Sequence, residues 1–232
     1  MILNYAKREW EWDCPNPITG RKLREPEGRV RWITHAEAQA LIRAAERVTQ
    51  APHLADFIKL ALHTGMRRGE MLGLEWRRVD LQTGLIHLEA DHDHTKAGKR
   101  RSVPMNAVAR EAIMGRLRFR AQHRPDSPWV FCDTQGQRIA DVKHSFATAR
   151  KAAGIEDFHI HDLRHTCAAW LVSAGVPLTE VRDLLGHSTV IMTERYAHLA
   201  PERIRDAVSR LEGAASRLSH AGEVSKVVKI AN

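Results

Sequence analysis

The chain has 232 residues, 43% of them hydrophobic, and its 36 basic and 28 acidic residues give a formal net charge of +8. No apolar run approaches the roughly 20 residues that span a bilayer, charge arrives too early for a signal peptide, and the three cysteines form no CxxC pair. These features argue against a membrane protein and a disulfide-stabilised secreted domain, and they predict a protein of the reducing cytoplasm.

The basic residues are mostly arginine, with 27 arginines and nine lysines, and the isoelectric point is near 9.8. A guanidinium group is a planar fork that matches two phosphate oxygens at once. The composition therefore indicates a polyanion as partner, although an excess of arginine can also reflect genome composition.

The first part of the chain is predicted to be a tail, a linker and then helices. Residues 1–30 carry two tryptophans followed by CPNPITG, which is typical of the end of an upstream domain and a linker. The stretch ITHAEAQALIRAAERV has Thr34 as a plausible N-cap and Glu37 three residues later, which fits a capping box. Residues 53–63 and 66–76 are expected to form two helices that break at HTG.

The periodicity then changes from helix to strand and back. The stretches GLIHLEADHDH and TKAGKRRSVPM predict two strands around a polar turn. FCDTQGQRI is expected to be a short extended piece with a turn. Further helices are predicted at 104–123, 141–153, 161–174, 177–185, 189–197 and 201–212. The sequence thus predicts a mainly α fold with a small antiparallel β-sheet, in the α+β class.

The first candidate for chemistry is HTGMRRGEML, residues 63–72. Gly65 is expected to end one helix and Arg67 to open the next, with Glu70 on the same helical face. An arginine held by a carboxylate at a helix start is oriented for an anion. The alternative interpretation is an ordinary surface ion pair.

The second candidate is the helix in HIHDLRHTCAAWLVSAG, residues 159–175. Its core stripe is predicted to be Leu163, Cys167, Trp170, Leu171 and Ala174. Gly175 is predicted to be the residue just past its C-cap. His161 and Arg164 are neighbours beside that stripe, at the first turn.

Two metal sites are weaker alternatives in this part of the sequence. One would use His159, His161, His165 and Cys167, but helical geometry does not bring these four together and no zinc-type spacing is present. The other is DHDH at 91–94, which we interpret as the solvated end of the hairpin.

The third candidate is LLGHSTVIMTERYAHL, residues 184–199. Gly186 is expected to end a helix, His187 follows it, and Tyr196 is one of only two tyrosines in the chain. Taken alone, a tyrosine in such a place is more often structural than catalytic.

The three candidates occur in an order that resembles the tyrosine recombinase (phage integrase) family. The matching stretches are TGMRRGE, TKAGKRRSVP, HDLRH, LLGHS and RYAHL, within residues 32–200. The resemblance implies the catalytic-domain architecture of that family and site-specific DNA recombination or DNA integration, by an integrase or excisionase partner of a mobile element or by a resolving recombinase.

The resemblance also implies a mechanism without metal or cofactor, in which a 3′-phosphotyrosine intermediate conserves the bond energy. The implied catalytic residues are Arg67 and Arg164 as the phosphate clamp, His187 as a further donor, Tyr196 as nucleophile, His161 as proton acceptor and Lys96 as general acid. Lys99 is the alternative to Lys96 if the register differs. Glu70 and His165 are implied in supporting roles.

Double-stranded DNA is the expected partner, with a homotetramer on paired sites, a monomer possible without DNA, and a cytoplasmic, nucleoid-associated location. Two other functions stay open. A type IB topoisomerase shares the chemistry but needs neither a specific sequence nor a tetramer. A non-catalytic DNA-binding protein would only grip phosphate and form no covalent bond.

The expected domains are residues 1–30 as a remnant of an N-terminal core-binding domain with its linker, 31–200 as the catalytic domain, and 201–232 as a C-terminal helix and tail. We expect a truncated catalytic domain that binds DNA weakly and with strong salt dependence. The helix PERIRDAVSRLE could pack on a neighbouring protomer or back on its own domain. The remaining tail could be disordered or form a strand.

Overall fold

A computed structural model describes residues 2–12, 30–89 and 100–200 of the chain. In these residues the helices are α1 (Ile2–Glu9), α2 (His35–Glu46), α3 (Leu54–Thr64), α4 (Arg68–Leu72), α5 (Ala107–His123), α6 (Lys143–Ala152), α7 (Ile160–Ser173), α8 (Leu178–Leu185) and α9 (Ile191–Glu194). Two 3₁₀ turns, η1 (Trp76–Arg78) and η2 (Ala197–Leu199), and three short strands complete the described secondary structure. The predicted fold class, mainly α with a small antiparallel sheet, is confirmed.

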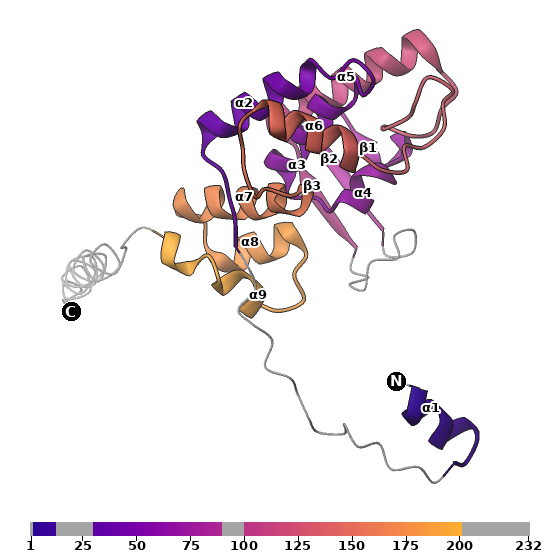
Figure 1. Cartoon of the computed structure of the whole chain (residues 1–232), viewed down its shortest axis with the longest axis vertical. Helices are drawn as coiled ribbons and strands as arrows, with labels where there is room; N and C mark the ends of the chain where they lie inside the picture. Colours follow the sequence, from indigo (N-terminus) through magenta and orange to yellow (C-terminus); the bar gives the residue numbers. More distant parts are fainter. Residues whose placement is uncertain (1, 13–29, 90–99, 201–232) are drawn as a thin grey trace, which may run out of the picture.

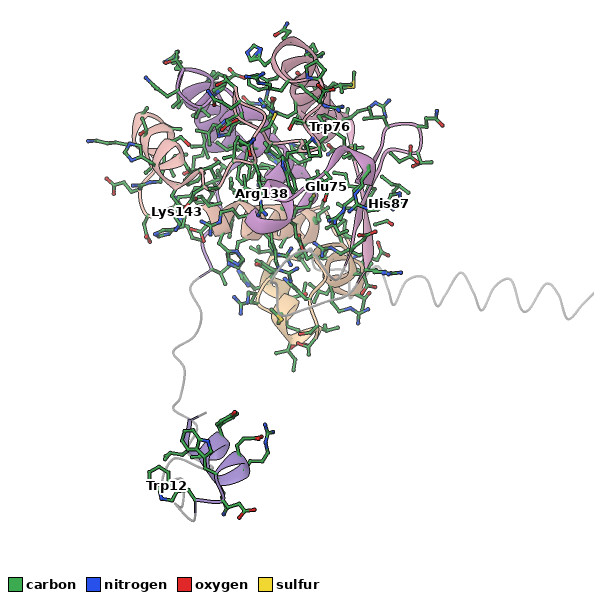
Figure 2. All side chains as sticks on the ribbon, turned by 90° about the vertical axis from the view of Figure 1, so that its right-hand side faces the viewer. Trp12, Glu75, Trp76, His87, Arg138 and Lys143 are labelled. Atoms are coloured by element: carbon green, nitrogen blue, oxygen red, sulfur yellow. The ribbon has the colours of Figure 1, made fainter. Side chains whose placement is uncertain are left out.

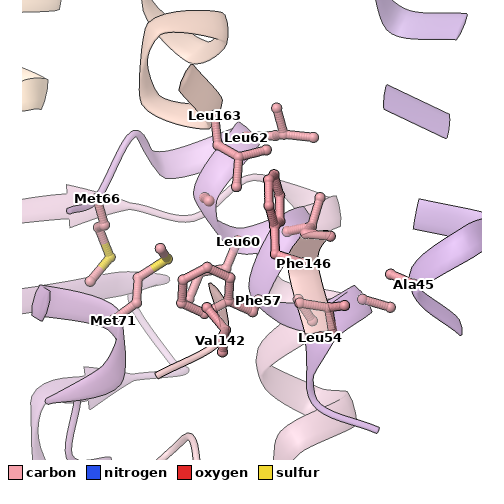
Figure 3. Packing of buried hydrophobic residues seen from close by; sticks show 14 of the residues in the cluster. Ala45, Leu54, Phe57, Leu60, Leu62, Met66, Met71, Val142, Phe146 and Leu163 are labelled. Carbon is pink, nitrogen blue, oxygen red and sulfur yellow. The ribbon is translucent and has the colours of Figure 1, made fainter. Parts of the chain in front are cut away.

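Helix α3 is the centre of the packing, because its neighbours α2, α5 and α7 all contact it (Figure 1). Eight of its eleven residues are buried, which follows from its nearly continuous apolar sequence LADFIKLAL. Its Leu54, Phe57 and Leu60 lie among Val142 and Phe146 from the α6 region (Figure 3). This large cluster is the main hydrophobic core of the described residues.

The sheet consists of β1 (Val79–Asp80), β2 (Leu85–Leu88) and β3 (Arg101–Pro104), in the order β1-β2-β3 and antiparallel throughout. The β2 and β3 pairing confirms the predicted hairpin, and its register sets Leu88 opposite Arg101. The two-residue strand β1 was not predicted, because it is too short to show an alternating pattern.

The sequence predicted the start of α2 and the end of α3 correctly, but it did not predict the end of α4. Thr34 and Glu37 form the predicted capping box at the start of α2. Gly65 ends α3 in a left-handed conformation with φ +63°, as expected. The predicted helix at 66–76 is wrong beyond Leu72. The chain there turns out to pair with residues near 130, where the Val130 N–H donates to the Leu74 carbonyl at 2.8 Å.

The predicted core stripe of α7 is also only partly right. Leu163 and Cys167 are buried, but Ala174 is exposed, whereas Ala168 and Val172 are buried on another side. Helix α7 is buried on several sides because it lies between the large cluster, which includes Leu163, and a second cluster. A single stripe describes only helices that have one buried face.

The second cluster consists of six buried residues from α7, α8 and the segment after α9: Ala168, Ala169, Val172, Val181, Leu185 and Tyr196. It joins α7 to α8, α9 and η2, the orange to yellow part of Figure 1. The predicted helix at 189–197 is two shorter pieces, α9 and η2, with Tyr196 between them. Gly175, at φ +83°, follows α7 and its C-cap Ala174 as predicted.

Several predictions lie outside the described residues: Lys96, Lys99, the DHDH stretch at 91–94 and the helix at 201–212. On α1 and the residues after it, Trp10 and Trp12 are exposed (Figure 2). Among the helices that the structure describes, none has the length and apolar character needed to cross a bilayer.

Candidate active site

Three arginine side chains converge on the C-terminal end of α8. Arg101 donates to the carbonyl of Leu184 at 3.1 Å, Arg164 to that of Leu185 at 2.6 Å, and Arg67 to that of Gly186 at 3.2 Å. The last carbonyls of a helix have no partner within the helix and carry its negative dipole end. Helix α8 therefore provides a framework for three positive groups from α7, β3 and the start of α4. We call Arg67, Glu70, Arg101 and Arg164 the arginine cage.

Glu70 is the carboxylate at the centre of the arginine cage and is 5% exposed. It receives two hydrogen bonds from Arg101, at 2.9 and 2.7 Å, and two from Arg67, one from the guanidinium at 2.9 Å and one from the backbone N–H at 2.7 Å. Burial raises the pKa of Glu70, but the hydrogen bonds and charge of Arg101 and Arg67 outweigh it and hold the pKa below its ordinary value. Three guanidiniums and one carboxylate leave the cage positive, which suits an anion.

The cage depends on two glycines in left-handed backbone conformation. Gly65 accepts a second hydrogen bond from Arg164 at 2.6 Å, and a Cβ there would lie 2.3 Å from Leu185. Gly186 has φ +66°, and a Cβ on it would lie 2.9 Å from Nη1 of Arg101. Any larger residue would carry both conformational strain and a contact with its neighbour.

Arg164 is the most enclosed of the predicted phosphate ligands, at 4% exposure. Burial is the main reason that its pKa falls to about 9, and the charge of Arg67 lowers it further while Glu70 opposes the change. The group still carries its charge at neutral pH. Its two hydrogen bonds use two of five N–H donors, so others are free to meet a ligand.

His187 follows α8 directly, and its Nδ1 lies 2.9 Å from the hydroxyl of buried Thr193. Burial is the largest cause that lowers the pKa of His187 to about 3, and Arg164 and Arg67 lower it further. The imidazole is therefore neutral near pH 7 and carries one N–H.

Tyr196 is only 1% exposed, and its phenol hydroxyl is hydrogen-bonded to Nδ1 of His165. Burial raises the pKa of Tyr196 to about 12, although Arg195 and Arg164 act in the opposite direction. Burial also lowers the pKa of His165 to about 4, with the nearby His161 as the next cause. The pair is thus a protonated phenol and a neutral imidazole.

His161, the predicted proton acceptor, contacts this pair without bonding to the phenol in the structure. Its ring packs edge-on against that of His165 with centroids 4.8 Å apart. One side of His161 faces solvent, yet desolvation by the surrounding protein is the main cause that lowers its pKa, followed by the charge of Arg164.

A cleft of about 690 Å³ opens beside the cage, and its walls include Arg67, Arg164 and His161. Phe146 and Phe158 also line it, as does Lys143 of α6, which is labelled in Figure 2. His165 and Tyr196 do not line it. The cleft is basic, since five arginines and lysines line it against the single carboxylate of Asp157.

The structure therefore brings together most of the residues that the sequence suggested. Arg67, Glu70, Arg164 and His187 meet at the end of α8, and His165 meets Tyr196 on the adjoining side of α7. Within residues 2–12, 30–89 and 100–200, no three His, Cys, Asp or Glu side chains are grouped to hold a metal ion.

Arg101 is the member of the arginine cage that sequence reasoning missed. It stands in the pair Arg100–Arg101, and alternation along a strand puts these two side chains on opposite faces. Nothing in the sequence told which of them faces inward.

The chain is similar to known proteins over most of its length. Residues 31–203 match the model of the phage integrase family. The chain is 33% identical over 227 residues to the integrase of Salmonella phage P22, an alignment that covers 91% of this chain and 54% of the phage protein. It is 30% identical over 213 residues to the shufflon-specific DNA recombinase of Escherichia coli, covering 91% and 50% of the two proteins.

A solved structure gives the same fold. The crystal structure of XerA recombinase matches with a TM-score of 0.63 at 25% sequence identity, covering 90% of this chain and 72% of that one. The chain spans about half the length of the curated relatives it matches.

Proposed function

The chain belongs to the phage integrase family, and on that premise we propose that it is a tyrosine-type site-specific DNA recombinase. In this proposal residues 31–200 form the catalytic domain, which cleaves and rejoins DNA through a 3′-phosphotyrosine bond. The observation that carries the proposal is the convergence of Arg67, Arg164 and His187 at the end of α8, beside a basic cleft.

Arg67 and Arg164 of the arginine cage would bind the scissile phosphate. Attack on a phosphodiester increases the negative charge on its non-bridging oxygens, so donors fixed in advance stabilise the transition state more than the ground state. Arg67 and Arg164 each have N–H donors beyond those that hold them to α8. If the Thr193 hydroxyl donates to Nδ1 of His187, the ring carries its proton on Nε2 and donates it to the same phosphate.

Tyr196 would be the nucleophile. Its oxygen attacks phosphorus, the bond to the 5′ oxygen breaks, and a 3′-phosphotyrosine and a free 5′ hydroxyl result. The phenol is buried against His165, so the segment that carries it must move before it meets a phosphate in the cleft. His161 lines that cleft and His165 does not, which supports His161 as the proton acceptor and His165 as the resting partner.

The departing 5′ oxygen needs a proton, and the proposal gives this role to Lys96, with Lys99 as the alternative. Both precede β3, which supplies Arg101 to the cage. Recombination joins two duplexes and cuts four strands, one tyrosine for each. We therefore propose a homotetramer on paired double-stranded sites.

A covalent capture experiment tests the proposal without a known target sequence. Nicked duplexes randomised around the nick are incubated with the protein, denatured, and the DNA that stays attached to protein is sequenced. We expect attachment at a small set of related sequences, and mass spectrometry of the digested adduct should find the nucleotide on Tyr196.

Tyr196→Phe is the matched variant, since it removes one oxygen from a buried ring. It should abolish the adduct and leave DNA binding unchanged. Attachment at every sequence, together with relaxation of supercoiled plasmid, would instead favour a type IB topoisomerase activity. Binding without any adduct would favour a non-catalytic DNA-binding protein.

A further inference from the structure

We propose that Arg101 is a positioning residue for the phosphate clamp, which holds Arg67 in place through Glu70. This inference rests on the proposed function for its catalytic consequence, but the positioning itself is a property of the DNA-free protein. It assigns a role to a residue on β3 that neither touches the cleft near Arg67 nor belongs to α4 or α7.

Arg101 uses its whole guanidinium group to bind other parts of the protein. All three of its guanidinium nitrogens are engaged: Nε with the Leu184 carbonyl at 3.1 Å, and Nη1 and Nη2 with the two oxygens of Glu70 at 2.9 and 2.7 Å. The fork-to-carboxylate geometry fixes the orientation of both partners. The side chain is 10% exposed, so its fork is directed at protein groups.

Glu70 binds both the side chain and the backbone of Arg67. One of its oxygens receives the Arg67 guanidinium at 2.9 Å and the other receives the Arg67 backbone N–H at 2.7 Å. The orientation of this carboxylate therefore sets both the side chain and the backbone of Arg67. Arg101 binds the same two oxygens from β3, so it determines how the carboxylate is turned.

Arg101 connects three elements of the fold. It links β3 to α4 through Glu70 and to the end of α8 through Leu184, next to Gly186, which Arg67 also contacts. Gly186 is tightly adjacent, since a Cβ there would lie 3.1 Å from Cζ of Arg101. Without the Arg101 side chain, Arg67 would be the one remaining guanidinium partner of Glu70. The Glu70 carboxylate could then rotate, and Arg67 would no longer be held in one orientation.

The experiment compares Arg101→Met with the control Arg78→Met. Arg78 is a matched arginine: it is 6% exposed and paired with Glu75 and Glu89, at 3.8 and 3.5 Å. Both substitutions remove one buried positive charge. Only Arg101→Met should affect Arg67.

The first readout uses the protein without DNA. Nuclear magnetic resonance of ¹⁵N-labelled arginine side chains reports slow guanidinium rotation when both Nη groups are bonded, and Arg67→Lys assigns the Arg67 signals. We expect the hindered Arg67 signals to average out in Arg101→Met and to persist in Arg78→Met. Persistence in both variants would overturn the inference, whatever the catalytic activity of the chain.

The second readout is the single-turnover rate of adduct formation on a captured duplex. Displacing a catalytic donor by about 1 Å can cost on the order of 100-fold, so we expect Arg101→Met to lose about tenfold to 100-fold. Arg101→Lys should lose nearly as much, because an ammonium group cannot bridge both oxygens of Glu70 and Leu184 together. Arg78→Met should match the parent rate.

A methylphosphonate at the scissile position separates positioning from general destabilisation. The parent enzyme should cleave it more slowly than phosphate, because one charged oxygen is missing. In Arg101→Met that ratio should move towards one, since Arg67 no longer meets the missing oxygen. An unchanged ratio would mean a structural role only, whereas no adduct with the parent protein would refute the proposed function and leave the resonance result to decide on positioning.

Discussion

The arginine cage and the tyrosine segment, residues 186–200, are held in very different ways. The cage is joined to α4, α7, α8 and β3 by hydrogen bonds of 2.6 to 3.2 Å, and it borders the large cluster of the molecule. The tyrosine segment consists of short pieces, α9 and η2, and packs through Tyr196 on a cluster of only six buried residues. The arginine cage is therefore held by several elements of the fold, whereas the tyrosine segment is held mainly by the burial of one side chain.

This difference fits what each half has to do in the proposed reaction. Groups that stabilise charge work best when they are fixed beforehand, because no energy is then spent on reorienting them during the reaction. A nucleophile whose pKa burial raises to about 12 is unreactive where it lies. It needs a segment that can move, and segments with few buried apolar contacts open most easily. The following changes test this contrast, from the largest expected effect to the smallest.

Arg164→Lys should have the largest effect on the cage. A lysine cannot reach the carbonyls of Gly65 and Leu185 together and still face a phosphate. We expect adduct formation to slow by about 100-fold to 1000-fold, measured in a single turnover. Arg124→Lys changes an arginine that bonds the Thr134 carbonyl and should leave the rate unchanged. Equal losses in both variants would contradict a special role for Arg164.

Glu70→Gln should weaken the same framework without changing its shape. Removing one partner of a buried ion pair destabilises a protein by about 3 kcal/mol, and chemical denaturation measures this at neutral pH. The substitution retains one carbonyl oxygen, so the chain should still fold. A loss below about 0.5 kcal/mol, the size typical of surface changes, would show that the cage does not depend on this carboxylate.

The pH dependence of stability gives a second view of Glu70. Its pKa is lower in the folded chain than in the unfolded chain, so the unfolded state takes up protons first as pH falls. The stabilisation is therefore complete above the unfolded pKa and disappears as pH drops below the ordinary glutamate pKa and through the lower folded pKa. Glu70→Gln should flatten the stability profile in that window.

Gly186→Ala tests the junction between cage and tyrosine segment. An alanine at φ +66° costs about 1 to 2 kcal/mol in any protein, and here its Cβ would also displace Arg101. Gly154 has φ +68° with nothing within 4 Å of a Cβ, so Gly154→Ala carries the strain alone. We expect similar stability losses and a slower adduct rate, by roughly tenfold, only for Gly186→Ala.

His165→Gln should have the smallest effect and should act on the tyrosine segment alone. Loss of the hydrogen bond to the phenol should cost about 1 kcal/mol. Hydrogen exchange should become faster in residues 190–199 and stay unchanged in α3. Faster exchange throughout the molecule would mean that the two halves of the site are not independent.

The sequence was most informative where a residue type has a single local role. Thr34 with Glu37 and the glycines 65, 175 and 186 placed helix ends correctly, because capping and left-handed turns are decided within a few residues. It failed beyond Leu72, where Leu74 is buried and its carbonyl accepts a hydrogen bond from the Val130 N–H. It also failed at 189–197, where Tyr196 is buried in the second cluster while Ile191 and Met192 stay exposed. At both places the helical periodicity continues in the sequence, although the helix ends and the chain contacts other segments.

For the candidate site, the sequence by itself determined the chemical groups and their order: two arginines, a glutamate, histidines and one tyrosine. Only the tertiary structure decided that Arg101 binds Glu70 beside Arg67, that the end of α8 accepts hydrogen bonds from all three arginines, and that Tyr196 rests against His165. The physical reason is distance along the chain. Arg101 and Glu70 are 31 residues apart and Arg164 and Gly65 are 99 apart, and contacts over such separations arise from packing, which local patterns do not encode.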